Sequence, residues 1–104
     1  SVDYPDFGYL LAKKLKKDSS ELGVLICGSG IGISIAANRK KNIRAALCTS
    51  AEMAKLARNH NNANVLCLGA RITEQDDAIA IFNSFLDSSF AKGRHIARVE
   101  KLSA

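Results

Sequence analysis

The segment from residue 22 to residue 38 constrains the fold most, because a short apolar run leads there through closely spaced glycines into a predicted helix. The residues up to Cys27 are mostly branched and apolar, which is typical of a strand buried on both faces. Gly28, Gly30 and Gly32 follow at alternate positions. A strand that turns through glycines into a helix points backbone N–H groups at one place, beside the positive end of the helix dipole. The segment therefore predicts an anion-binding loop.

Cys27 is the last residue of the predicted strand, so its sulfur should lie at the rim of this loop. Backbone amides and a helix N-terminus stabilise a thiolate, which makes Cys27 a candidate base or nucleophile. A buried structural cysteine beside a tight turn is the alternative interpretation.

Two further apolar strands are expected, at residues 43–48 and 65–68, and helical segments separate the three strands. Strands that are apolar on both faces and alternate with helices predict a Rossmann-like α/β fold, a three-layer α/β/α sandwich around a parallel sheet. Ligands bind beyond the carboxyl ends of the strands in such sheets, and Cys27, Thr49 and Arg71 fall at those ends. The helices are expected to turn three apolar stripes toward the core: Phe7, Leu10, Leu11 and Leu15; Met53, Leu56, Ala57 and His60; Ile79, Ile81, Phe82, Phe85 and Leu86.

The composition narrows the class of protein. A chain of 104 residues suits one domain, residues 1–104, and it has neither a membrane-length apolar run nor a signal-peptide pattern. Three cysteines, an odd number, indicate reduced thiols and a cytoplasmic protein rather than a disulfide framework. The net charge of +5 comes without an aromatic platform or a basic recognition motif, so a phosphorylated small molecule is expected rather than nucleic acid or a membrane.

Two familiar glycine-loop chemistries do not fit. A dinucleotide fingerprint needs a third glycine where Ile33 stands, and an acid at the end of the next strand, where residues 48–50 are Cys-Thr-Ser. A cysteine phosphatase needs an arginine six residues past the thiol, and that position is again Ile33.

His60 ends the apolar stripe of its predicted helix, and a satisfied core histidine is one interpretation. Asn61, Asn62 and Asn64 follow it and offer hydrogen-bonding groups beside the one side-chain type that ordinarily titrates near neutral pH. This setting favours a functional histidine. Neither a second histidine nor a carboxylate stands at ligand spacing, so no metal site is expected.

Arg94 and Arg98 stand one turn apart on the last predicted helix, residues 94–102. A solvated helix face is the ordinary interpretation of such a pair. Two guanidinium forks on the same side also match the geometry of a phosphate.

Several blocks of sequence, spread in order over the chain, resemble the ribose-5-phosphate isomerase type B family of the ribose/galactose isomerase superfamily. They are Asp3 to Phe7, Cys27 to Asn38, Ile43 to Cys48, Arg58 to Leu66, and Gly93 to Glu100.

The resemblance implies an aldose–ketose isomerase of carbohydrate metabolism, in the pentose phosphate pathway, that needs neither a metal nor a cofactor. It would interconvert ribose 5-phosphate and ribulose 5-phosphate through an enediolate, as a homodimer or tetramer with sites at the subunit interface. By similarity, Cys27 would be the base, and His60 would open the sugar ring with Asn61 beside it. The enediolate oxygen would be held by the loop of Gly28, Ser29, Gly30, Ile31 and Gly32, with Ser29 assisting, and the phosphate by Arg71, Arg94 and Arg98.

The sequence departs from the family pattern in two places. Asn62 stands where the family usually has Asp, a change that should be tolerated. The family also begins with a strand, a helix and a second strand, roughly 30 residues or more, and the first of these strands carries an Asp-His pair that contacts the sugar phosphate. The chain starts at Ser1, ahead of the helix that follows this unit, so it is expected to be truncated at its N-terminus relative to the family.

Two alternative functions stay open at this point. A subunit of galactose-6-phosphate isomerase would use the same residues on a six-carbon sugar phosphate. A phosphocysteine carrier domain of a sugar phosphotransferase system also places a cysteine before a glycine loop. In such a carrier the cysteine lies on the first strand of the domain, whereas here a predicted helix precedes that strand. The His60, Arg94 and Arg98 blocks would also have no role in a carrier.

Overall fold

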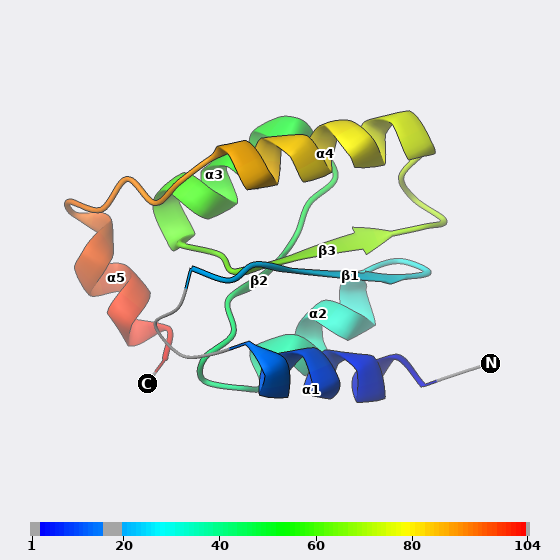
Figure 1. The fold of residues 1–104 in the computed structure, drawn as a ribbon, viewed down its shortest axis with the longest axis horizontal. Coiled ribbons are helices and arrows are strands. Elements are labelled where there is room, and N and C mark those ends of the chain that lie inside the picture. Colours follow the sequence, from blue (N-terminus) through cyan, green and yellow to red (C-terminus); the bar gives the residue numbers. More distant parts are fainter. Residues whose placement is uncertain (1–2, 16–19, 104) are drawn as a thin grey trace.

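A computed structural model describes residues 3–15 and 20–103, and it places a three-stranded parallel sheet between two layers of helices (Figure 1). The elements, in chain order, are α1 (Tyr4–Lys14), β1 (Gly23–Cys27), α2 (Ile31–Asn38), β2 (Ala45–Leu47), α3 (Ala51–Asn61), β3 (Val65–Gly69), α4 (Gln75–Asp87) and α5 (His95–Lys101).

The sheet has the strand order β1-β3-β2, with β3 in the centre. Every residue of β3 is buried, as its apolar sequence VLCLG predicts for a strand covered on both faces. The register pairs Gly23 with Val65 and Cys27 with Gly69, so the carboxyl ends of β1 and β3 lie level with each other. The predicted α/β/α architecture with a parallel sheet is therefore confirmed.

The strand β2 is shorter than the predicted segment 43–48. The backbone N–H of Ile43 donates to the carbonyl of Lys40 in a turn, and the N–H of Arg44 donates to the side-chain oxygen of Asn64 at 2.7 Å. The parallel pairing with β3 runs only from Ala45, opposite Val65, to Leu47, opposite Cys67, so these residues alone form β2.

Helices cover both faces of the sheet. α1 and α2 lie on one side and α3 and α4 on the other, while α5 stands at the end of the molecule where the strands begin (Figure 1). One buried cluster joins α1 and α2 to the sheet around Leu25, Ile33 and Val65, and the second joins α3 and α4 to it around Leu66 and Phe85. In the described part of the chain, no helix is both long enough and apolar enough to cross a membrane.

The buried face of α3 is made of small residues, and the predicted stripe is wrong at three of its four positions. Ala54 and Ala57 are buried, whereas Met53, Leu56 and His60 are exposed. Methyl side chains let α3 pack close to the sheet, and the larger apolar side chains consequently lie on the outer faces.

In α1 and α4, too, the buried residues differ from the predicted apolar stripes. Only Ile81 and Phe85 of the predicted stripe of α4 are buried. In α1 the buried residues are Gly8 and Ala12, and Leu15 is buried directly after the helix. A methyl group at Gly8 would lie 3.3 Å from the Ala36 side chain, so α1 and α2 approach closely through small residues. The apolar residues left exposed, against the prediction, are Phe7, Leu10, Ile79, Phe82 and Leu86.

Candidate functional site

The loop after β1 brings a thiol and backbone amides together. The N–H of Gly30 donates to Cys27 Sγ at 3.2 Å, and the N–H of Ile31 donates to Ser29 Oγ at 3.2 Å. Both amides belong to the start of α2, so the Cys27 sulfur lies at the positive end of that helix. The predicted proximity of Cys27 to the glycine amides is confirmed.

Gly30 is required by the backbone at the turn into α2. Its φ is +80°, in the left-handed region, and a side chain there would lie 2.9 Å from the carbonyl carbon of Leu68 and 3.1 Å from the amide nitrogen of Gly69. Gly69 is equally confined, because a side chain on it would collide with the Ser29 carbonyl. Gly30 in the loop after β1 and Gly69 at the end of β3 therefore let the loop rest directly on the end of β3.

Replacing Gly30 with alanine should lower the free energy of unfolding by more than the ~1–2 kcal/mol that the left-handed backbone costs a residue with a side chain, because the added methyl also meets β3. Gly93→Ala is the matched control: Gly93 has φ +59° and nothing within 4 Å of an added methyl, so it carries the backbone cost alone. Urea unfolding of both variants measures the difference. If both variants lose the same free energy of unfolding, the loop moves away from the methyl group at residue 30 without an energetic penalty.

Arg71 reaches the same loop from the end of β3. Its backbone N–H donates to the carbonyl of Gly28 at 2.9 Å, and the preceding N–H, of Ala70, donates to the carbonyl of Cys27 at 2.8 Å. A methyl group at Gly28 would lie 3.4 Å from Arg71 Nε, so the arginine side chain passes over this glycine. Cys27, Ser29 and Arg71 thus meet at the carboxyl edge of the sheet, where the sequence places them.

A second group of polar side chains lies between the end of α3 and α5. His60 and Asn61, from α3, and His95 and Arg98, from α5, line a pocket of about 280 Å³. The rings of His60 and His95 are stacked, with centroids 4.6 Å apart and an interplanar angle of 19°. The structure thus brings His60, Asn61 and Arg98 together, as predicted, and places Arg94 at the start of α5 beside them.

His95 is the residue of this group that the sequence interpretation missed as a site residue. Partial removal of its ring from water, followed by the positive charges of His60, Arg94 and Arg98, lowers the pKa of the His95 imidazole. The signal in the sequence was its place between two arginines that are themselves candidate site residues, as one of only two histidines in the chain.

Within a single chain, the Cys27 loop and the group of polar side chains around His60 lie at opposite ends of the sheet. Cys27 is level with Gly69 at the carboxyl end of β3, whereas α3 runs from Asn61 into the amino end of β3 at Val65. The length of β3 alone separates these levels by about 13 Å, and α5 lies beyond the end where the strands begin (Figure 1). One chain therefore does not bring Cys27 and His60 together.

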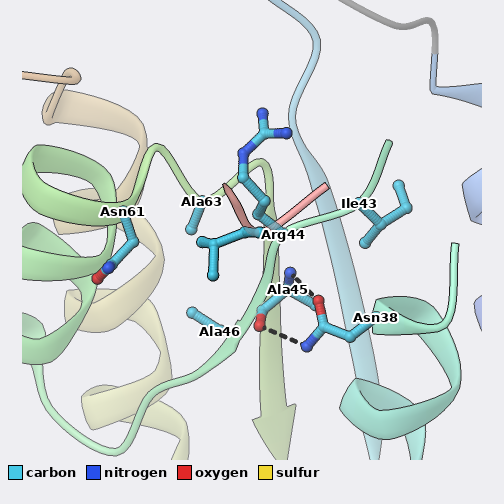
Figure 2. Close-up of a pocket in the computed structure, with 8 residues that line it drawn as sticks. Asn38, Ile43, Arg44, Ala45, Ala46, Asn61 and Ala63 are labelled. Carbon is cyan, nitrogen blue, oxygen red and sulfur yellow. Dashed lines mark hydrogen bonds between the residues drawn. The ribbon is translucent and has the colours of Figure 1, made fainter. Parts of the chain in front are cut away.

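A further pocket of about 370 Å³ adjoins the histidine group along β2 and shares Asn61 with it. Figure 2 shows that the Asn38 side chain lies along β2 in this pocket. Its Nδ2 donates to the carbonyl of Ala45 at 2.9 Å, and its Oδ1 accepts from the N–H of Ala45 at 2.7 Å. Among the described residues, no group of three histidine, cysteine or acidic side chains could hold a metal ion.

The fold and the loop define a class: a Rossmann-like α/β protein with a glycine loop that follows β1 and carries a thiol at the carboxyl edge of its sheet. Residues 1–102 match the ribose/galactose isomerase family, and the chain belongs to that family.

Named relatives are similar over almost the whole chain. The probable ribose-5-phosphate isomerase B of Mycoplasma genitalium is 50% identical over 101 residues, which are 96% of this chain and 66% of the relative. A solved structure of ribose 5-phosphate isomerase B from Anaplasma phagocytophilum is 54% identical, with a TM-score of 0.92 over 98% of this chain and 69% of that one. The Mycoplasma genitalium enzyme solved with bound ribulose-5-phosphate is 48% identical, with a TM-score of 0.93 over 99% of this chain and 68% of that one. The chain thus spans about two thirds of the length of these relatives.

Proposed function

We propose that this chain belongs to a cofactor-independent aldose–ketose isomerase that interconverts ribose 5-phosphate and ribulose 5-phosphate. The observation that carries the proposal is the Gly30 amide 3.2 Å from Cys27 Sγ, in a family whose Mycoplasma genitalium relative holds ribulose-5-phosphate. The proposed setting is the cytoplasm, since the three cysteines are free.

Cys27 is the proposed base. Its thiolate would take the proton from C2 of the open-chain aldose, and the C1 carbonyl oxygen would gain the negative charge. The hydroxyl proton on the C2 oxygen would then pass to the C1 oxygen, and the Cys27 thiol would return its proton to C1, which leaves the ketose carbonyl at C2. The charge that develops on oxygen needs donors held in place before the reaction. The amides of Gly30 and Ile31 start α2 at this place, and Ser29 Oγ lies beside them, 3.2 Å from the Ile31 nitrogen.

The histidine group would bind and open the cyclic sugar. Opening the furanose breaks the bond between C1 and the ring oxygen O4, and one proton must pass from the hydroxyl on C1 to O4. The His60 imidazole would carry this proton, with Asn61 in the same pocket. Arg94 and Arg98 would hold the phosphate from α5, and Arg71 is the third candidate, from the Cys27 side.

A homodimer, alone or within a tetramer, follows from the separation of the two groups. Because Cys27 and His60 lie at opposite ends of one chain, a complete site needs the Cys27 loop of one protomer facing the His60 pocket of its partner. A two-fold axis then creates two such sites at once, since each contact is repeated.

The deciding experiment is to incubate the protein with ribose 5-phosphate and to follow ketose formation. Turnover of ribose 5-phosphate well above that of galactose 6-phosphate supports the proposal, and the opposite order favours the galactose-6-phosphate isomerase alternative. Incubation with a phosphohistidine donor tests the carrier alternative, in which Cys27 would become phosphorylated. No ketose from either sugar, even after the family's N-terminal strand, helix and strand have been added ahead of residue 1, would contradict an isomerase function.

Arg98→Ala should raise KM for ribose 5-phosphate by about tenfold or more, with little change in kcat. A phosphate contact remote from the reacting carbons contributes similar binding in the ground state and the transition state, and charged hydrogen bonds are typically worth ~1.5–3 kcal/mol. Arg39→Ala, an exposed arginine at the end of α2, is the control for net charge. Initial rates over a range of substrate concentration separate KM from kcat. An unchanged KM would remove Arg98 from the phosphate site.

We also propose that the free edge of β1 receives another parallel strand in the complete enzyme. The N–H of Gly23 and the carbonyl of Cys27 bond toward the β3 side, so Val24 and Ile26, which alternate with them, point their backbone groups outward. The Ile26 side chain is 59% exposed, although it belongs to a strand of the sheet.

Adding a family-like strand, helix and strand ahead of residue 1 should raise both the melting temperature and kcat, because it covers this edge and, by the family resemblance, supplies sugar-phosphate contacts. The measurement compares the 104-residue chain with the extended one by thermal unfolding and turnover. A short chain that matches the extended one in both would refute the proposal.

A further inference from the structure

The two histidines of the chain meet face to face at the junction of α3 and α5. His60 lies in the last turn of α3, and His95 is the first residue of α5. Their rings stack with a centroid distance of 4.6 Å and line the same pocket. The N–H of Ala91 donates to the carbonyl of Asn59 at 2.9 Å, which ties the segment before α5 to the end of α3.

This stack is the contact that orients the His60 ring. Rotation of a histidine ring about its last side-chain bond is a broad, weakly restricted motion, and His60 is exposed. Within the described residues the His60 ring makes no hydrogen bond, so the face of His95 is what restricts its plane. Aromatic pairs in offset or near-parallel contact prefer a defined geometry.

We propose that His95 is a positioning residue for His60 in the opening of the sugar ring. This inference rests on the proposed isomerase function. In the step, the C1–O4 bond breaks, the C1 carbonyl forms, and one proton passes from the hydroxyl on C1 to O4 through the His60 imidazole. The imidazole must face both oxygens in turn, so a ring held in one plane transfers the proton more often than a freely rotating one.

The charges around the pair suit this role. The groups that act on His95 are His60 from α3, and Arg94 and Arg98 from its own helix, and all of them are basic. They favour the uncharged form of His95 near neutral pH. An uncharged partner can stay stacked on His60 whether or not His60 carries the proton in transit, whereas two imidazolium rings at 4.6 Å would repel each other.

The test compares His95→Ala, which removes the stack, with His95→Phe, which keeps an aromatic face. Two assays are run on each variant. Turnover of ribose 5-phosphate requires ring opening, whereas exchange of the C1 proton of ribulose 5-phosphate with D2O does not, because this ketose is already open. Lys101→Ala is the control, as an exposed basic residue at the far end of the same helix.

His95→Ala should lower kcat for ribose 5-phosphate about three- to tenfold, the size expected for one aromatic pair, with proton exchange at the wild-type rate. His95→Phe should stay within about twofold of wild type in both assays, because a stacked ring still restricts His60. An unchanged kcat in His95→Ala overturns the proposal. A parallel fall in both assays, or a His95→Phe defect equal to that of His95→Ala, overturns it as well, since either would show a role in binding or folding.

The same measurements separate this inference from the proposed function. If the wild-type protein, in its complete oligomeric form, exchanges no proton and forms no ketose, the isomerase proposal itself fails. An NMR cross-peak between the ring protons of the two histidines then still reports whether the stack forms in solution. If the wild type exchanges protons and the alanine variant turns over ribose 5-phosphate normally, only the positioning role is lost.

Discussion

Replacing Cys27 with alanine should lower kcat for ribose 5-phosphate by about 10²- to 10⁴-fold, the range typical for loss of a general base, while sugar-phosphate binding is largely retained. The sulfur lies 3.2 Å from the Gly30 amide, at the place where the enediolate charge would develop, and alanine offers no proton acceptor there. The arginines of α5 are untouched by the change. Initial rates give kcat, and calorimetry with ribulose 5-phosphate gives the dissociation constant.

Two controls accompany this variant. Asn83→Ala changes an exposed side chain of α4, outside both groups of site residues, and should leave the rate unchanged. Iodoacetamide should inactivate the wild type by modifying Cys27 alone, because burial raises the pKa of Cys48 to about 11 and, with the nearby Cys27 and Cys48, that of Cys67 to about 12. A Cys27→Ala protein that keeps its rate and loses only affinity would make Cys27 a packing residue.

Mixing two inactive variants, Cys27→Ala and His60→Ala, should restore about a quarter of the wild-type activity. If each site takes Cys27 from one protomer and His60 from the other, a mixed dimer has one intact site and one doubly altered site. Random exchange puts half of the dimers in the mixed form. The measurement is turnover of ribose 5-phosphate after subunit exchange at equal concentrations.

Each variant taken through the same exchange alone should stay inactive, which excludes reactivation by the procedure itself. Native mass spectrometry of differently tagged chains establishes how much mixed dimer has formed. A mixed dimer without activity would show that Cys27 and His60 act within one chain, against the distance that the fold sets between them.

The glycine loop could be predicted from sequence because its determinants are local. An apolar strand ends at Cys27, and Gly30 adopts a left-handed backbone conformation that residues with a side chain rarely adopt. The parallel sheet follows from strands without polar alternation. The register of β1 with β3 could not be read in the same way, because it depends on the contact of Gly69 with the Ser29 backbone, which joins two distant segments.

Local sequence patterns could not predict which helix faces are buried, or that the candidate site residues lie in two separate groups. Ala54 and Ala57 give a weaker hydrophobic signal than Met53 and Leu56, yet close packing on the sheet selects the small residues for the interior. The stacking of His60 on His95 depends on where α5 folds back against α3, which no spacing within either helix encodes.

The side-chain amide of Asn38 covers the first residue of β2 at one edge of the sheet. By bonding both the N–H and the carbonyl of Ala45, it occupies backbone groups that a neighbouring strand would need at β2, while Val24 and Ile26 stay available on the outer side of β1. An added strand is therefore expected to pair with β1 rather than at Ala45 of β2, so the two edges of this sheet are not equivalent for association.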